Sequence, residues 1–343
     1  MKRAFITGIT GQDGSYLAEF LEKKGYEVHG LVRRTSTFNR HNIEHIFNTE
    51  SKREHQLHYG DMSDINSLIN IIRKVKPDEI YNLAAQSHVQ VSFDIPYYTA
   101  QADAVGVLSL LEAVRVLAIK PKIYQASTSE LYSGDKSQAP QSEKTPFKPR
   151  SPYGVAKLYA FEIARVYRES YGMFVCNGIL FNHESPRRGR NFVTRKITRG
   201  IAEIVNGTRD NILLGNLNAA RDWGYAPEYM EAAWKMLQQK TPKDYIIATG
   251  ETHTIREFAE EAFKVVGINL TWHGKGLKEK GVDKKTRKVL IKVDSSFFRP
   301  NEVQFLSGKA SLAKRELKWI PRTGFKELVK IMVEADLEHI KHE

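Results

Sequence analysis

The feature that most constrains the fold is the stretch Gly8-Ile9-Thr10-Gly11-Gln12-Asp13-Gly14, in which a glycine returns at every third position. It follows the apolar run 4–6 and precedes residues 15–21, whose large apolar side chains fall on one helical face. A strand, a glycine turn and a helix in that order form a phosphate cradle, because small residues let the backbone approach a pyrophosphate and the helix N-terminus offers unpaired N–H groups. A purely structural turn is the alternative interpretation of three glycines.

The residues after the next apolar run, 26–32, indicate which dinucleotide the cradle would hold. Sites for NAD usually place a carboxylate about 20 residues beyond the glycines, where it binds the ribose 2′-hydroxyl. Arg33, Arg34 and Ser36 stand there instead. Guanidinium and hydroxyl groups bind a 2′-phosphate that a carboxylate would repel. The alternative is a pair of surface arginines, but together with the glycine turn the pattern favours NADP.

Apolar runs alternate with helical periodicity along the first 180 residues. Strands are expected at 57–62, 79–83, 122–126 and 174–181, with helices between them, including one over 105–117. This alternation implies right-handed crossovers and an α/β fold with a doubly wound parallel sheet of the Rossmann type. At strand ends, Asp61 is expected near the adenine, and the small residues of Ala84-Ala85-Gln86-Ser87 suit close approach to a ligand.

A second motif lies downstream, where Tyr153 and Lys157 stand four residues apart at the expected start of a helix. Both side chains then project from one face. An ammonium near a phenol favours phenolate and lowers the pKa of the tyrosine, which makes it a usable base near neutral pH. A solvated helix face is the usual explanation of such a pair. Behind a nucleotide fold and the hydroxyl-rich run 127–130, the pair indicates catalysis.

Later segments carry cations among small and polar residues. The run 182–189 is expected to form a site loop, and Lys196, Arg221 and Arg299 supply the charges that a diphosphate ligand requires.

The net charge of +12 over 343 residues admits nucleic acid as a partner, but phosphorylated small molecules or a solvated surface explain it equally well. The densest basic cluster, 275–292, is interrupted by glycines and contains no aromatic residue, so we expect an exposed loop and no nucleic-acid partner. The single cysteine, Cys176, is expected in the core. No membrane span or signal peptide is expected, and the cytoplasm is the predicted compartment.

These residues resemble the extended short-chain dehydrogenase/reductase family and, within it, the GDP-mannose 4,6-dehydratases. The resemblance is carried by Gly-Ile-Thr-Gly-Gln-Asp-Gly (8–14), Asn-Leu-Ala-Ala-Gln-Ser (82–87), Ser-Thr-Ser-Glu (127–130), Tyr-x-x-x-Lys (153–157), Leu-Phe-Asn-His-Glu-Ser-Pro (180–186) and Arg-Asp-Trp-Gly-Tyr-Ala (221–226). It extends over essentially the whole chain. The glycines and Tyr-x-x-x-Lys are shared with many relatives, whereas the 127–130 and 180–186 runs are much more specific.

The resemblance implies a redox-neutral dehydration with tightly held NADP, a first step toward GDP-6-deoxyhexoses such as GDP-fucose or GDP-rhamnose. Tyr153, supported by Lys157 and Thr128, would deprotonate the 4-hydroxyl of GDP-mannose while hydride leaves C4. Glu130 would remove the C5 proton of the 4-ketone and protonate the departing 6-hydroxyl, and the hydride would return to C6. Thr128 and Glu130, two apart on an extended segment, would point to the same side.

The resemblance also implies the binding residues, with no metal among them. Beyond the glycine turn, the arginines and the strand ends already named, it assigns Met62, Leu83, Tyr98, Lys157, His183 and Arg188 to the cofactor. It assigns to the substrate Ser87, Ser129, Asn182, Val193, Lys196, Asn216, Arg221, Arg299 and Glu302.

A cofactor domain over 1–180, with returning segments near 216–245 and 290–305, and a GDP-sugar lobe over 181–343 are implied as well, as is a homo-oligomer. An epimerase or a 4-ketoreductase would share the fold, the cofactor, Tyr153 and Lys157, but neither needs a base at C5, so Glu130 argues against both. A non-catalytic NADP-sensing or nucleic-acid-binding protein would not need Tyr153, Lys157 or Glu130.

Overall fold

The computed structural model describes residues 1–48, 53–298, 301 and 303–341. Its centre is a seven-stranded sheet in the order β11-β6-β5-β4-β1-β2-β3, in which every neighbouring pair is parallel. The doubly wound Rossmann-type fold is therefore confirmed. The strands are β1 (Arg3–Thr7), β2 (Glu27–Val32), β3 (Leu57–Tyr59), β4 (Glu79–Asn82), β5 (Lys122–Thr128), β6 (Val175–Leu180) and β11 (Tyr245–Ile247).

The strand order reverses between β1 and β4, which is where such sheets bind ligands beyond their carboxyl ends. A row of buried polar side chains crosses this point. The Thr7 hydroxyl donates to Asn82, whose amide donates to Gln125 over 2.7 Å. The same hydroxyl oxygen accepts from the backbone N–H groups of Leu83 and Ala84, each at 3.1 Å. These bonds fix the loop after β4 beside the glycine turn that follows β1.

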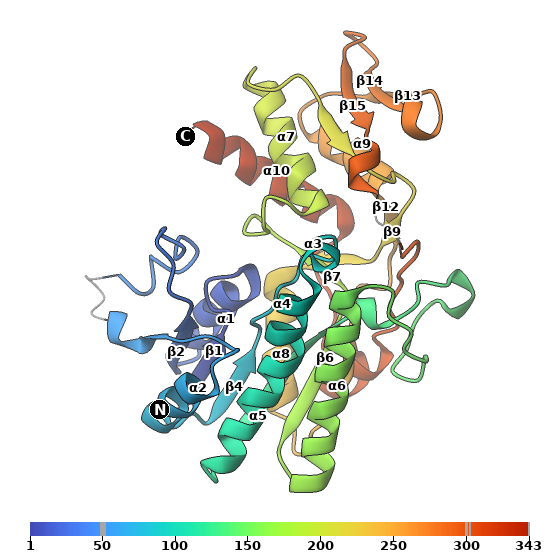
Figure 1. The fold of residues 1–343 in the computed structure, drawn as a ribbon. Coiled ribbons are helices and arrows are strands. Elements are labelled where there is room, and N and C mark those ends of the chain that lie inside the picture. Colours follow the sequence, from blue (N-terminus) through green and yellow to red (C-terminus); the bar gives the residue numbers. More distant parts are fainter. Residues whose placement is uncertain (49–52, 299–300, 302, 342–343) are drawn as a thin grey trace.

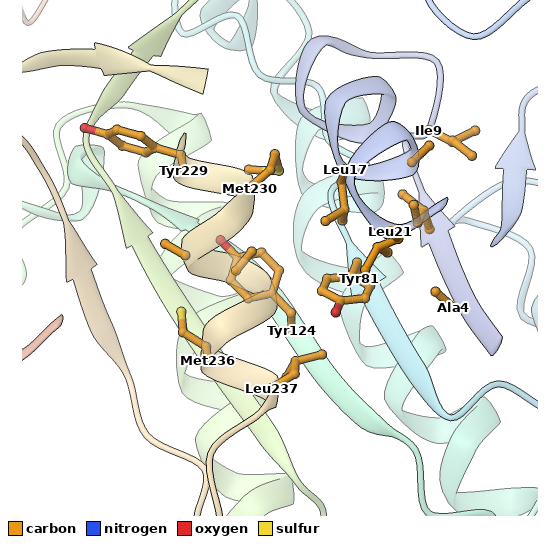
Figure 2. Close-up of a cluster of buried hydrophobic side chains, with 14 of the residues drawn as sticks. Ala4, Ile9, Leu17, Leu21, Tyr81, Tyr124, Tyr229, Met230, Met236 and Leu237 are labelled. Carbon is orange, nitrogen blue, oxygen red and sulfur yellow. The ribbon is translucent and has the colours of Figure 1, made fainter. Parts of the chain in front are cut away.

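Helices cover both faces of the sheet because its strands alternate apolar side chains between the faces. On one face α2 (Ile65–Val75), α5 (Gly106–Val116) and α6 (Pro152–Tyr171) bury Phe5 and Ile80. On the other, α1 (Gln12–Lys23) and α8 (Ala226–Leu237) cover Ala4, Tyr81 and Tyr124. Figure 2 shows Met230, Met236 and Leu237 of α8 directed into the same cluster as Leu17 and Leu21 of α1.

A smaller lobe stands beyond one end of the sheet (Figure 1). It contains α7 (Val193–Val205), α9 (Ile255–Val265), α10 (Phe325–Lys341) and a sheet of β13 (Leu270–His273), β14 (Lys280–Asp283), β15 (Val289–Val293) and β8 (Ile212–Leu214). Its apolar core is separate and includes Ile201, Phe258 and Met332. A buried ion pair, Arg195 to Asp336 at 2.6 Å, ties α7 to α10.

Two short strand pairs lie where the chain passes between the lobes. β7 (Asn182–Glu184) pairs with β10 (Trp223–Tyr225), and β9 (Ala220–Arg221) pairs with β12 (His253–Thr254). After residue 181 the chain returns to the central sheet in α8 and β11. Val303 and Leu306 also pack in a core cluster beside the central sheet. β15, in contrast, belongs to the sheet of the smaller lobe. The domain boundary near residue 180 and its returning segments stay a prediction.

Two expectations about the strands and loops outside the site were wrong or incomplete. The basic stretch 275–292 is largely a hairpin of β14 and β15 rather than a loop, because Val282, Leu290 and Ile291 are buried while the lysines between them stay exposed. The edge strand β11 was not anticipated. Cys176 is fully buried, as expected. Among the described residues, no helix combines the length and apolar character needed to cross a bilayer.

Candidate active site

One cavity of about 1040 Å³ extends from the glycine turn, past the ends of β2, β4 and β5, to α7 in the smaller lobe. Most residues assigned to a site from the sequence line it. They are Gly8, Thr10, Gly11, Gln12, Asp13, Gly14, Arg33, Asp61, Met62, Leu83, Ala84, Ala85, Ser87, Tyr98, Thr128, Ser129, Glu130, Tyr153, Lys157, Asn182, His183, Arg188, Val193, Lys196, Asn216 and Arg221.

The three glycines of the turn have different reasons for being glycine. Gly8 has φ +68°, and a Cβ there would lie 2.8 Å from the backbone nitrogen of Ala84. A Cβ on Gly14 would lie 2.3 Å from the Gly8 carbonyl oxygen. At Gly11, which precedes α1, a Cβ would meet only that oxygen, at 3.3 Å, and would otherwise enter the cavity. A methyl group at Gly11 would therefore occupy cavity space at the turn, whereas one at Gly8 or Gly14 would collide with backbone.

The end of β2 brings part of the expected cofactor set together. Arg33 donates a hydrogen bond to the Tyr98 hydroxyl, so two residues far apart in the sequence meet at the cavity wall. Arg34 and Ser36 are exposed and do not line the cavity, and the Arg34 guanidinium lies over the ring of Tyr59 instead. Gln86 also faces away, because its side-chain amide donates to Thr99 at 3.2 Å.

The four expected catalytic side chains converge where β5 ends and α6 begins. Ser151 caps α6 by accepting from the Gly154 N–H at 3.0 Å. Tyr153 lies on this first turn, and the hydroxyl of Thr128 acts on its phenol to favour the phenolate. The Thr128 hydroxyl oxygen also accepts from the backbone N–H of Glu130 at 3.1 Å. Thr128, Glu130, Tyr153 and Lys157 are all buried.

The segment after β5 is not extended as the sequence suggested. β5 ends at Thr128, and Ser129–Leu131 form a 3-10 turn whose N-cap is Thr128 itself. A threonine hydroxyl that accepts from the N–H two residues later stabilises such a turn. Glu130 therefore reaches the cavity by turn geometry rather than by the alternation of a strand.

The charges around Tyr153 differ from the sequence-based expectation of a lowered pKa. Burial, followed by the negative charge of Asp103, raises the pKa of Tyr153, and its hydrogen bond with Thr128 opposes the rise. Burial lowers the pKa of Lys157, which Asp103 and Asp13 oppose. The Lys157 ammonium donates to the carbonyl oxygen of Ala126 at 3.1 Å and lies 5.8 Å from the centre of the Tyr153 ring. Burial is therefore the main determinant of the pKa of Tyr153.

Asp103 is a residue of this site that sequence reasoning missed. It is fully buried on a π-helical turn (Gln101–Val105) between α4 (Pro96–Ala100) and α5. Its Oδ1 accepts from the Gln86 N–H at 2.7 Å, whereas Oδ2 is buried and has no hydrogen-bond partner among the described residues. Burial raises the pKa of Asp103 to about 6, although the charge of Lys157 and the bond from Gln86 oppose this. No sequence signal marked it, because an aspartate in a helical stretch is usually solvated.

The far end of the cavity gathers cations near the smaller lobe. Lys196 on α7 is half-buried, and burial followed by the nearby charge of Arg209 lowers its pKa to about 8. Its ammonium lies over the ring of Phe297. Glu203, which also lines the cavity, pairs with Arg209 at 2.6 Å and with Arg199 at 3.0 Å. Glu203, Arg199 and Arg209 were not singled out from the sequence, because charged residues on and near a helix are normally solvated. Arg299 and Glu302 lie outside the described residues.

Comparison with known proteins identifies relatives over nearly the full length. The model of a family described as GDP-mannose 4,6 dehydratase matches residues 5–332. The chain is 57% identical to the GDP-mannose 4,6 dehydratase of Drosophila melanogaster, over 98% of this chain and 86% of that protein. It is 56% identical to that of Homo sapiens, over 98% and 91% respectively.

Solved structures support the fold. A dTDP-glucose 4,6-dehydratase of Streptomyces venezuelae, solved with NAD, superposes with a TM-score of 0.81 over 99% of this chain and 98% of that one. Its sequence is 22% identical, so the likeness concerns the arrangement of the elements.

Proposed function

The chain belongs to the GDP-mannose 4,6-dehydratase family, and we propose that it removes one water from GDP-mannose to form GDP-4-keto-6-deoxy-mannose. The observation that carries the proposal is the convergence of Tyr153, Lys157 and Glu130 in one cavity that begins at the glycine turn. A reductase or an epimerase would need the first two residues but no carboxylate to take a proton from C5.

NADP is the cofactor that we propose for the sheet end of this cavity. The open space beside Gly11, which has no Cβ, and the first turn of α1 suit a pyrophosphate, and the guanidinium of Arg33 suits a 2′-phosphate. When bound, the nicotinamide would supply a temporary hydride acceptor and donor. Arg34 and Ser36, which the sequence also assigned to the 2′-phosphate, lie outside the cavity wall and would have to reach it by a change of loop conformation.

Tyr153 is the proposed base for the 4-hydroxyl of the sugar. The buried Lys157 beside it and the hydroxyl of Thr128 favour the phenolate, which is the form that can accept a proton. Burial raises the pKa of Tyr153 and opposes this form, so the phenol must release its own proton before the reaction begins. As a phenolate, Tyr153 then takes the 4-hydroxyl proton while the C–H bond at C4 breaks, and it becomes a neutral phenol.

Glu130 is the proposed acid and base for the elimination. The 4-ketone acidifies the C5 hydrogen, and the carboxylate removes it. The same carboxyl then gives its proton to the C6 oxygen, so that the C6–O bond breaks and water leaves. One proton is taken and one is returned, which leaves Glu130 as it began.

The reaction class is tested by mass spectrometry of GDP-mannose after incubation with the protein and NADP. We expect a product lighter by one water. An unchanged mass with a changed sugar stereochemistry would instead indicate epimerisation.

Two variants separate the proposed roles. Tyr153→Phe should form neither bound NADPH nor product, because oxidation at C4 cannot begin. Glu130→Gln should still form some bound NADPH and then stall, with a loss of about 10²–10⁴-fold in turnover. Single-turnover absorbance of NADPH and solvent-deuterium incorporation at C5 distinguish them. Near-normal turnover or deuterium incorporation in Glu130→Gln would remove the main support for the dehydratase.

A homo-oligomer in the cytoplasm is the proposed assembly and location. Helices α5 and α6 lie against each other and carry exposed apolar side chains, among them Val116, Val155, Tyr159 and Val166. A second copy is the proposed occupant of this face. Native mass spectrometry of the wild type and of Val166→Lys tests it: a wild-type monomer would contradict the proposal.

A further inference from the structure

The loop after β6 is fastened to the glycine turn by the side chain of His183. Its Nε2 lies 2.8 Å from Oδ2 of Asp13, and its Nδ1 lies 2.7 Å from the carbonyl oxygen of Phe181. Gln12 strengthens the same junction, because its amide donates to the His183 carbonyl oxygen at 3.1 Å and to Oδ1 of Asp13 at 3.0 Å. These contacts join the first turn of α1 to β7, 170 residues further along the chain.

The two partners of the ring define its protonation state. A carbonyl oxygen accepts hydrogen bonds and never donates them, and the same holds for a carboxylate. Both ring nitrogens of His183 must therefore carry a proton, whereas a neutral imidazole carries only one. Burial lowers the pKa of His183, but the charge and hydrogen bond of Asp13 outweigh burial and leave that pKa raised.

Asp13 is correspondingly held as a carboxylate. Burial raises its pKa, yet the charge of His183 and the hydrogen bonds from His183 and Gln12 leave the pKa lowered overall. The side chains of His183 and Asp13 are only 11% and 23% exposed, so water screens the pair little.

The groups that face the pair come from several elements. Tyr229 of α8 stacks its ring on His183, with centroids 4.7 Å apart and planes inclined by 22°. An aromatic face favours a cation. Arg188, in the turn that follows β7, opposes the imidazolium charge, while Lys157 of α6 and Tyr124 of β5 interact electrostatically with Asp13.

We infer that His183 is held as an imidazolium cation which neutralises Asp13 and pins the 182–188 loop to the glycine turn. Asp13 lines the cavity in the first turn of α1, where a diphosphate would sit, and an unpaired carboxylate there would repel it. The cation removes that repulsion and holds β7 against the first turn of α1, which form two sides of the cavity at this point. His183 is thus a positioning residue, and its effect on cofactor binding rests on the NADP site proposed above.

The charge state is tested by nuclear magnetic resonance of ¹⁵N-labelled histidine in deuterated full-length protein. The signal is assigned by its loss in His183→Gln. We expect both ring nitrogens of His183 to be protonated at neutral pH, and Asp13→Asn to lower the titration midpoint by about one pH unit or more. A neutral His183 ring at pH 7 in the wild type overturns the inference without any variant.

The positioning role is tested by calorimetric titration with NADP. His183→Gln should weaken binding about tenfold or more, because it leaves the Asp13 carboxylate unpaired at an anion site. Wild-type affinity should fall as the pH rises through the titration midpoint of His183, since the cation is present below that midpoint. Affinity in His183→Gln should not change over that interval.

A double variant distinguishes neutralisation from a merely structural role. His183→Gln combined with Asp13→Asn removes both charges, so it should bind NADP more tightly than His183→Gln alone. Equal or weaker binding by the double variant would overturn the neutralising role. His45→Gln is the matched control, because it removes another histidine–carboxylate pair, His45 to Glu19 at 2.7 Å, outside the cavity.

The outcomes separate this inference from the proposed function. If the wild type binds no NADP, the proposed cofactor is wrong, but the histidine titration still determines whether His183 is charged. A wild type that binds NADP with a neutral His183 would sink the inference alone. Circular dichroism of each variant confirms that weakened binding does not reflect unfolding.

Discussion

Single side chains in the cavity wall and directly behind it have chemical properties that depend on their burial as well as on their type. Lys196 and Asp103 are shifted in opposite directions by it: the pKa of the ammonium falls to about 8 and that of the carboxyl rises to about 6. Each shift favours the neutral form of the group, because a buried charge loses its hydration. Both groups therefore titrate within reach of ordinary solution experiments.

Lys196 should make nucleotide binding depend on pH. Its charged form attracts a diphosphate, and the charge is lost as the pH rises through about 8. We expect the affinity for GDP, measured by calorimetry, to fall between pH 7 and 9. Lys196→Gln should bind about tenfold more weakly at pH 7, the loss of one charge-assisted contact, and should lack this pH dependence. Lys196→Arg stays charged throughout and serves as the control. An identical pH profile in Lys196→Gln would contradict the prediction.

Asp103 should make stability depend on pH in a defined direction. Its pKa in the folded protein is about 6, above the ordinary value of 3.8, so the native state binds this proton more tightly than the unfolded chain does. The resulting stabilisation is complete below pH 4 and is lost as the pH rises through 6. Asp103→Asn has no charge to bury at this position. Its free energy of unfolding should therefore rise relative to that of the wild type, by on the order of 1–3 kcal/mol, as the pH increases from 4 to 7.5.

Chemical denaturation at several pH values measures this difference. Asp94→Asn, a change at an exposed aspartate on the nearby helix α3 (Val91–Asp94), is the control. Parallel stability curves for Asp103→Asn and the wild type would contradict the raised pKa.

At the scale of elements, the glycine turn combines two requirements that substitution can separate. Gly14→Ala would place a methyl group within 2.5 Å of backbone atoms of Gly8 and Ile9, which cannot move aside. We expect a loss of about 3 kcal/mol or more in the free energy of unfolding. Gly11→Ala should change stability by only about 1 kcal/mol but weaken NADP binding, because its methyl group enters the cradle. Denaturation and calorimetry together test the pair, and equal effects of the two variants on stability would contradict it.

The elements that could be predicted are those whose sequence pattern is long or unmistakable. The first six strands of the central sheet follow from apolar runs between helical periods, and the motif glycines, Tyr153 and Lys157 follow from spacing. β11, which comprises only Tyr245–Ile247, was not anticipated, although β3 is equally short and was. The 3-10 turn after Thr128 depends on one hydroxyl contact, and the burial of Asp103 depends on helices packed around it. The spacing of residues in the sequence predicts neither the 3-10 turn nor the burial of Asp103.

At the scale of the whole molecule, the densest basic cluster of the sequence and the cavity occupy different places. No described residue of the hairpin region 275–292 lines the cavity. Replacing Lys284, Lys285 and Lys288 with glutamine should therefore leave kcat/KM within about twofold of the wild type. Affinity of the wild type for duplex DNA should be roughly 10⁻⁴ to 10⁻⁶ M near physiological salt, and weaker still in the triple variant. Nanomolar, sequence-selective binding in a gel-shift or anisotropy assay would contradict this view of the surface.

The position of α8 in the chain also governs when this protein can fold during its synthesis. α8 covers the apolar side of the central sheet that contains Tyr81 and Tyr124, yet it is translated only after α7 and β8 of the other lobe. A nascent chain that has not reached residue 226 must hold that apolar surface open to water. Such surfaces bind chaperones or one another. We therefore expect that the first 225 residues do not fold into a complete nucleotide-binding domain during synthesis. The core of the sheet and the cavity would form only after α8 has been translated.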